Sequence, residues 1–239
     1  MSEIAVVPDV AGAAAELFIE ATAGAIAARG RAAVGLTGGS TASPLYAELV
    51  RSQKIPWDKL QIFFTDERAV PPDHELSNYR IARQELFDKT PIDSRQVHRL
   101  RGEAKDLEAE AQRAARESRE ALGIPPRLDL MLLGLGPDGH ILSLFAGVPS
   151  SADRGDEELV RHVKAPEHVE PKVERITLTP FLLVTARTVV LQVKGASKAA
   201  VLAKAMKGAN DLVGCPAQWL RKAAGRAVVV CDEEAAKDL

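Results

Sequence analysis

Short runs of apolar, β-branched residues alternate along this chain with longer segments that have the hydrophobic periodicity of helices. This alternation is typical of βαβ units, in which helices connect parallel strands and cover the sheet. Strands are predicted at 4–7, 32–36, 60–65, 128–133, 175–178, 188–194 and 227–231. Helices are predicted at 10–30, 44–51 and 103–122, near 179–180 and after residue 195. The pattern predicts an α/β fold with a mainly parallel sheet.

Linker composition does not divide the chain, so we expect one domain over residues 1–239. The longest loop is predicted at 149–172, a polar segment of mixed charge with three prolines. It is the only segment in which we expect a lid.

Composition excludes several classes of protein. The 239 residues are 46% hydrophobic and 27% charged, as in ordinary globular proteins. A net charge of −2 gives no basic excess for nucleic acid or an anionic membrane. The two cysteines and five histidines show no metal-ligand spacing, and no export signal or membrane span is evident. We therefore expect a cytoplasmic protein without a metal.

Polar residues follow four of the predicted strands. These segments are 37–41, 66–68, 138–140 and the pair Ser197 and Lys198. In open parallel sheets, ligands bind outside the carboxyl ends of the strands. Four polar strand ends at one edge would form a site for a small, polar, anionic ligand.

The first two segments each allow two interpretations. Gly38-Gly39-Ser40-Thr41 can bind phosphate through free amides at a helix start, or it can be a tight turn. No Gly-Lys-Ser/Thr follows, so it is not a nucleotide P-loop. Asp66-Glu67-Arg68 is either a surface ion cluster or part of a site. In extended backbone, Asp66 and Arg68 face one side and Glu67 faces the other.

The segment 134–140 matches the glycine spacing of a dinucleotide site, which we reject. Pro137 removes an amide, and Asp138 puts a negative charge where pyrophosphate would lie. His140, two residues from Asp138, is the best candidate for a general base among the five histidines. Arg175 and Lys198 are either anion ligands or solvated surface charges.

Taken together, these residues resemble the 6-phosphogluconolactonase family. The matching segments are Gly38-Gly39-Ser40, 64–71, Ser77-Asn78-Tyr79, 133–140, Ser143-Leu144-Phe145, 175–179 and 195–199, which extend in the family's order over residues 31–231. The resemblance implies a three-layer α/β sandwich of the glucosamine-6-phosphate deaminase type. It also implies hydrolysis of 6-phosphoglucono-δ-lactone, the second step of the oxidative pentose phosphate pathway, with no metal or organic cofactor.

Under this hypothesis each candidate residue has a role. His140 deprotonates the attacking water, Asp138 or Glu67 orients its ring, and Arg68 stabilises the alkoxide. We expect substrate and phosphate contacts from Gly38, Gly39, Ser40, Thr41, Asp66, Arg175 and Lys198. The expected partner is a small sugar-phosphate lactone, and the protein is expected to be a monomer or weak homo-oligomer.

Two alternatives remain at this point. The resemblance extends to glucosamine-6-phosphate deaminases, in which a carboxylate at the position of Asp66 moves a proton between carbons. Arg68 and the segment 143–145 favour the lactonase over this aldose–ketose isomerase chemistry. A non-enzymatic sugar-phosphate sensor would need a DNA-binding segment, and the chain has no spare basic region for one.

Overall fold

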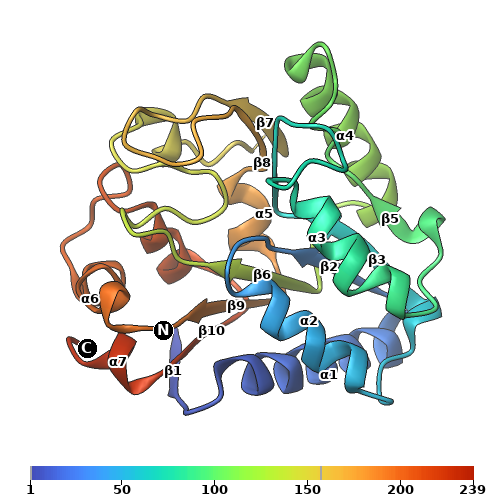
Figure 1. The fold of residues 1–239 in the computed structure, drawn as a ribbon, viewed down its shortest axis with the longest axis horizontal. Coiled ribbons are helices and arrows are strands. Elements are labelled where there is room, and N and C mark those ends of the chain that lie inside the picture. The colour runs from blue at the N-terminus through green and yellow to red at the C-terminus, as the bar shows by residue number, and fades with distance from the viewer. Residues whose placement is uncertain (1, 157) are drawn as a thin grey trace.

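The predicted parallel sheet forms the centre of the computed structural model, which describes residues 2–156 and 158–239 (Figure 1). Within these residues, seven strands pair in parallel throughout. In spatial order they are β1 (Glu3–Val6), β10 (Arg226–Cys231), β9 (Thr188–Val193), β6 (Leu130–Gly134), β2 (Ala32–Leu36), β3 (Leu60–Phe64) and β5 (Val97–His98). The prediction of a mainly parallel sheet is confirmed.

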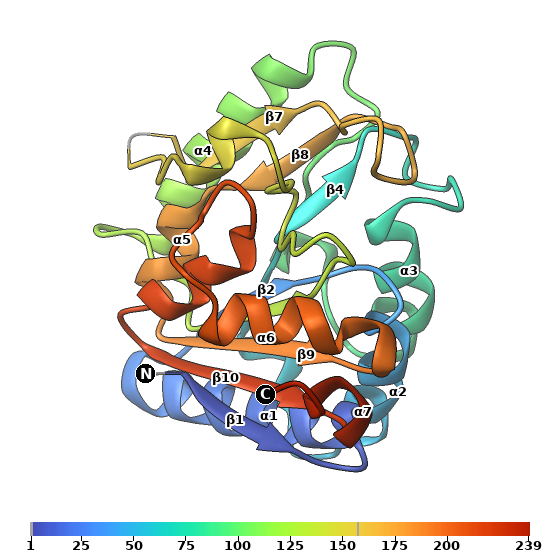
Figure 2. The ribbon, with the colours of Figure 1, turned by 90° about the vertical axis from the view of Figure 1, so that its left-hand side faces the viewer.

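Helices cover both faces of this sheet (Figure 2). On one face lie α1 (Val10–Arg29) and α2 (Ala42–Arg51), with α3 (Asn78–Glu85) packed against α2. The other face carries α5 (Pro180–Thr185) and α6 (Ala199–Lys207). The remaining helices are α4 (Leu107–Leu122), which contacts the small sheet, and α7 (Glu233–Ala236) near the C-terminus. The resulting layers are helix, sheet and helix.

A second, antiparallel sheet was not predicted. Its strands are β4 (Asp66–Arg68), β8 (Arg175–Leu178) and β7 (Val160–Val163), in that order. A three-residue charged strand such as β4 gives no hydrophobic pattern, because its conformation depends on pairing with β8 far along the chain. The prediction of one long loop over 149–172 was wrong in part, since β7 and a 3-10 helix (Pro149–Ala152) lie within it.

Several predicted boundaries agree with the structure because local capping sets them. The Asp9 side chain accepts a hydrogen bond from the Gly12 amide at the start of α1, and Gly30 ends this helix with φ 75°. The helix expected from residue 103 begins instead at Leu107, because Asp106 caps it through the Ala109 amide. These side-chain caps fix where α1 and α4 start.

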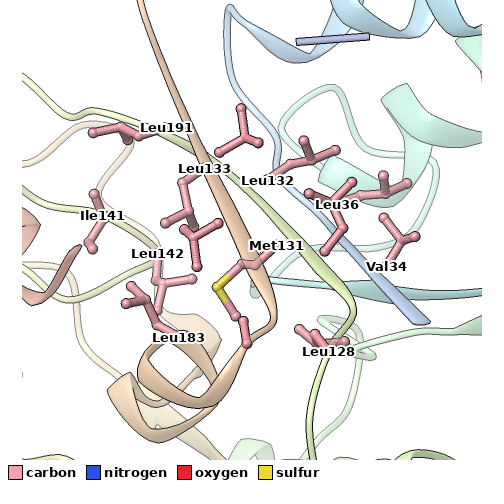
Figure 3. Packing of buried hydrophobic residues seen from close by; sticks show 14 of the residues in the cluster. Val34, Leu36, Leu128, Met131, Leu132, Leu133, Ile141, Leu142, Leu183 and Leu191 are labelled. Atoms are coloured by element: carbon pink, nitrogen blue, oxygen red, sulfur yellow. The ribbon is translucent and has the colours of Figure 1, made fainter. Parts of the chain in front are cut away.

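Strand β6 is buried on both faces, which explains its nearly continuous apolar sequence. Figure 3 shows Met131 and Leu133 on the side of the strand that faces Leu183 of α5 and Leu142. Leu132 points the opposite way, as the alternation of a strand requires. This packing fixes the end of β6, and hence the start of the 134–140 segment.

The order of the strands reverses between β2 and β6. From β2 the chain continues to β3 and β5 on one side of the sheet, whereas β6 leads to β9 and β10 on the other. The loops after β2 and β6 therefore diverge and leave a crevice at the carboxyl ends of the strands. This reversal is where open α/β sheets bind ligands.

Helix α1 is long and apolar enough to suit a membrane span by length and hydropathy. In this structure it contacts β2, β9 and β10 of the large sheet and packs against α2. Its buried residues include Phe18, whose side chain is fully enclosed. These contacts make α1 a core helix of the fold.

We expect Phe18→Ala to lower the free energy of unfolding by about 3–5 kcal/mol, because it removes a buried ring and leaves a cavity between α1 and the sheet. A thermal melt should show a fall in Tm of roughly 10 °C. The control is Glu16→Ala on the exposed side of α1, which should change stability by less than about 0.5 kcal/mol. Equal melting of the two variants would contradict the packing of α1.

Candidate active site

A cavity of about 760 Å³ opens at the carboxyl ends of β2, β6 and β9. It lies at the reversal in strand order described above. The predicted site residues that line it are Gly38, Gly39, Ser40, Thr41, Asp66, Arg68, His140 and Lys198. Residues that are far apart in the sequence thus meet around one space, as expected from the four polar strand ends.

His140 is held by Asp138. The Nδ1 atom of its ring lies 2.5 Å from the Asp138 Oδ1 atom, and the His140 backbone amide donates to the same oxygen at 3.2 Å. Burial acts to raise the pKa of Asp138, but the hydrogen bonds and charge of His140 outweigh it and lower this pKa overall. Asp138 is therefore ionised, and it accepts a hydrogen bond that keeps a proton on the Nδ1 atom of His140.

Gly136 makes room for the histidine ring. A Cβ atom at Gly136 would lie 2.1 Å from His140 Nδ1, so any side chain there would displace the imidazole. The Gly136 amide also donates to the His140 carbonyl at 2.8 Å and closes the loop. Phe145 packs edge-on against the ring, with centroids 5.4 Å apart. The glycine at position 136 thus makes space for the His140 ring.

Glu67 points away from this pair. Its side chain is 2% exposed and accepts four hydrogen bonds at the start of α3. The donors are the backbone amides of Arg68, Asn78 and Tyr79 and the Ser77 hydroxyl. Burial raises the pKa of Glu67, although these hydrogen bonds oppose the shift. Of the two carboxylates considered as partners of His140, only Asp138 contacts it among the described residues.

Asp66 and Arg68 face the cavity, on the side of β4 opposite Glu67. The Asp66 Oδ2 atom accepts a hydrogen bond from the Ser143 hydroxyl at 2.7 Å, and Asn78 Nδ2 lies 3.3 Å from its Oδ1 atom. The Arg68 Nη1 atom donates to the Leu76 carbonyl at 2.7 Å. Its Nε atom is buried without a hydrogen-bond partner in the described part of the chain. Arg68 therefore retains donors for a ligand.

The glycine loop presents free amides to the cavity. Tyr46 fixes its start by donating from its hydroxyl to the Thr37 carbonyl at 2.9 Å. Gly38 packs against Asn78, whose Oδ1 atom would lie 1.9 Å from a Cβ at this position. Within the described residues, the amides at 39–41 make no hydrogen bond. Such amides before a helix are a suitable site for an anion.

The two predicted cationic ligands occupy different positions. Lys198 lines the cavity, and burial lowers its pKa while the charge of Asp138 partly opposes the shift. Arg175 is 3% exposed and is not among the lining residues described. Burial and the charge of Arg68 lower the pKa of Arg175 to about 10. Its guanidinium donates to the carbonyls at 171 and 173, so its contact with phosphate stays a prediction.

Sequence reasoning missed residues that contribute to this site. Gln192 is the lone polar residue of an otherwise apolar stretch of β9; it lines the cavity at 1% exposure, and within the described residues its Nε2 atom has no partner. Its polarity in that strand was a usable signal. His168, given low weight as a loop histidine, has its Nε2 atom 3.5 Å from Asp138 Oδ2. No sequence pattern links His168 to Asp138, because only the fold brings them together.

The chemistry of the cavity is one of charges and hydrogen bonds. Of the described residues that line it, none is Phe, Tyr or Trp. Cationic and anionic side chains share its wall, including Arg51, Lys194, Glu48 and Glu170. Across 2–156 and 158–239, no three His, Cys, Asp or Glu side chains gather in a way that could hold a metal ion. The arrangement can position a base, Nε2 of His140, against a polar anionic ligand.

Comparisons with known proteins show which family this chain resembles. The family model described as glucosamine-6-phosphate isomerases/6-phosphogluconolactonase matches residues 7–229. The 6-phosphogluconolactonase of Synechocystis sp. is 36% identical over 219 residues, which cover 90% of this chain and 88% of that protein. The 6-phosphogluconolactonase of Mycobacterium tuberculosis is 36% identical over 227 residues and 90% of each chain.

Solved structures show the same fold. The 6-phosphogluconolactonase from Trypanosoma cruzi superposes with a TM-score of 0.87 at 27% identity and covers 100% of this chain and 97% of its own. A monomeric glucosamine-6-phosphate deaminase superposes with a TM-score of 0.84 at 21% identity, over 99% of this chain and 100% of its own. The second similarity concerns the fold alone. The predicted three-layer fold of the deaminase type is confirmed.

We expect Glu67→Gln to destabilise the protein by about 2–3 kcal/mol, because a glutamine amide cannot accept all four hydrogen bonds and leaves buried donors unpaired. The fall in Tm should be roughly 5–10 °C. Glu75→Gln, an exposed carboxylate of the neighbouring loop, is the matched control and should melt like the wild type. A stable Glu67→Gln protein would show that Glu67 does not support the start of α3.

Proposed function

The chain belongs to the glucosamine-6-phosphate isomerase/6-phosphogluconolactonase family, and we propose that it hydrolyses 6-phospho-D-glucono-1,5-lactone to 6-phospho-D-gluconate, the second step of the oxidative pentose phosphate pathway. The observation that carries this proposal is the Asp138–His140 pair beside a cavity lined by Arg68, Lys198 and free backbone amides. Hydrolysis of the phosphorylated lactone needs an activated water, a hydrogen-bond donor for the alkoxide and groups that bind the phosphate. The cavity offers a group for each.

The first step uses His140 as the general base. Because Asp138 accepts from Nδ1, the neutral ring carries its proton there and its lone pair on Nε2. Nε2 takes a proton from water as the water oxygen bonds to the lactone carbonyl carbon. The carbonyl π electrons move to oxygen and form a tetrahedral alkoxide. General-base catalysis of this kind contributes about 10²–10⁴-fold.

The second step opens the ring. Arg68 donates to the alkoxide, an interaction whose loss costs roughly 3–4 kcal/mol in comparable sites. The alkoxide re-forms the carbonyl, and the bond between this carbon and the ring oxygen breaks. The protonated Nε2 of His140 gives its proton to the leaving ring oxygen. The ring nitrogen is then neutral again, and the product is the open-chain acid.

We assign phosphate binding to Lys198 and the glycine loop, which both line the cavity. Lys198 and the amides of 39–41 provide a cation and hydrogen-bond donors for the 6-phosphate. Asp66, held by Ser143, accepts a substrate hydroxyl. Arg175 joins the phosphate only if it exchanges its present carbonyl partners. These contacts orient the lactone carbonyl toward His140 and Arg68.

We also propose that the enzyme acts in the cytoplasm on a small-molecule substrate, without metal or organic cofactor. Lactone hydrolysis changes no oxidation state, so a base and hydrogen-bond donors are sufficient chemistry. The net charge of −2 supports a protein that does not bind nucleic acid.

We expect the wild type to accelerate loss of 6-phosphogluconolactone generated in situ at pH 6.5, relative to a buffer blank. His140→Ala should lower kcat about 10²–10⁴-fold, because it removes the base. Product binding, followed as a thermal shift with 6-phosphogluconate, should persist in the variant. Near-normal turnover by His140→Ala would rule out this base.

Glucosamine 6-phosphate separates the lactonase from the deaminase alternative. The wild type should release no ammonia from it under the same conditions. Ammonia release without lactone hydrolysis would replace the proposed function with deamination.

We expect Lys198→Ala to raise KM for the lactone about ten- to hundredfold with a smaller effect on kcat, because it removes a charged hydrogen bond to a group remote from the reacting carbon. Lys207→Ala, at the far end of α6, is the matched control and should leave both constants unchanged. A fall in kcat alone would place Lys198 at the reacting carbon instead of the phosphate.

A further inference from the structure

One oxygen of the Asp138 carboxylate is unexplained by the mechanism. Its Oδ1 atom is bonded to His140, whereas its Oδ2 atom is buried and has no hydrogen-bond partner among the described residues. Leaving a buried acceptor of this charge unpaired is costly. The His168 Nε2 atom lies 3.5 Å from this oxygen, within reach of an ion pair and slightly beyond a hydrogen bond.

His168 is carried by an anchored segment, the 164–174 loop between β7 and β8. Val169 beside it is buried at 6% exposure, and Arg175 donates to the carbonyls at 171 and 173. The His168 side chain itself is 53% exposed. Its backbone is thus fixed while its ring is free to turn, and a shift of about 0.5 Å would complete a hydrogen bond to Oδ2.

We propose that His168 is a positioning residue that holds the second oxygen of Asp138 and so sets the proton affinity of His140. The inference rests on the proposed function, in which His140 is the base. His168 touches neither water nor lactone in this scheme. It acts through the carboxylate, which is shared between two imidazole rings.

The direction of the effect is the same in both protonation states of His168. A charged ring attracts the Asp138 carboxylate and repels a proton on His140. A neutral ring that donates Nε2–H to Oδ2 withdraws negative charge from Oδ1. Either way His168 weakens the support that Asp138 gives to protonated His140. Removing His168 should therefore make His140 easier to protonate.

Other charged groups lie in the same loop, line the cavity or pack near the ring, and they remain constant in the comparison. Lys198 interacts with the charge of Asp138, and Lys172 pairs with Glu167 at 3.2 Å within the loop. Glu170 lines the cavity. Arg175 approaches from β8, with its guanidinium carbon 6.0 Å from the centre of the Phe145 ring that packs on His140. Because none of these groups is altered, a change in His140 titration reports on His168.

The test is a ring-proton NMR titration of His140 in the wild type, His168→Gln and His168→Ala. Both variants should raise the midpoint of the titration by roughly 0.5 pH unit. The acid limb of the pH profile of kcat should shift to higher pH by the same amount. Well below the midpoint this shift lowers kcat about threefold, and on the plateau kcat does not change. His162→Gln is the matched control, because His162 lies on β7, pairs with Glu174 of the 164–174 loop and has no contact with Asp138 among the described ion pairs.

A double-mutant cycle separates coupling from a general disturbance. With Asp138→Asn in the background, His168→Gln should no longer move the His140 midpoint. An unchanged midpoint in both His168 variants, an equal shift in His162→Gln, or a shift that survives Asp138→Asn would overturn the proposal. The titration needs no substrate, so a shift seen in a protein that fails to hydrolyse the lactone overturns the proposed function alone.

Discussion

The hydrogen bond between Asp138 and His140 is the interaction on which the site depends. It fixes the proton on Nδ1 and leaves Nε2 for the cavity. The contact requires a loop in which Gly136 has no side chain, since a Cβ there would overlap the ring. It also requires that the loop begin at the end of a buried strand. The packing of β6 between two apolar layers therefore acts directly on the position of His140, the proposed base.

Both sheets contribute residues to the cavity. The parallel sheet supplies the glycine loop after β2 and the histidine loop after β6, which diverge at the reversal of strand order. The antiparallel sheet brings β4 to the same opening. Asp66 and Arg68 face the cavity, and the buried Glu67 faces the start of α3. Glu67 in turn caps α3, whose first residue Asn78 contacts Asp66. One short charged strand thus has one side that lines the cavity and another that supports the start of α3.

Periodicity and capping were sufficient to predict six of the seven strands of the large sheet, because its central strands are apolar and buried and Asp9 and Gly30 mark the ends of α1. The edge strand β5 was missed, because two residues carry no periodicity. The antiparallel sheet was not predictable from local pattern, since β4 and β7 are short and polar and form by long-range pairing. Most of the candidate site residues were found because they follow strands. The choice between Asp138 and Glu67 as the partner of His140, and the burial of Arg175, were not predictable, because both depend on side-chain directions that spacing does not determine.

Of the buried side-chain polar atoms without a partner in the described residues, those of Ser2 and Arg99 lie away from the cavity and the other four lie at it. Arg68 Nε, Asp138 Oδ2 and Gln192 Nε2 are buried without partners in the described part of the chain, and their residues line or adjoin one cavity. Elsewhere the fold satisfies even a buried carboxylate such as Glu67 with four donors. Leaving the buried donors and acceptors at the cavity unpaired has a cost in stability. We expect a polar, anionic ligand to complete the hydrogen bonds of Arg68 and Gln192, whereas the second oxygen of Asp138 faces His168.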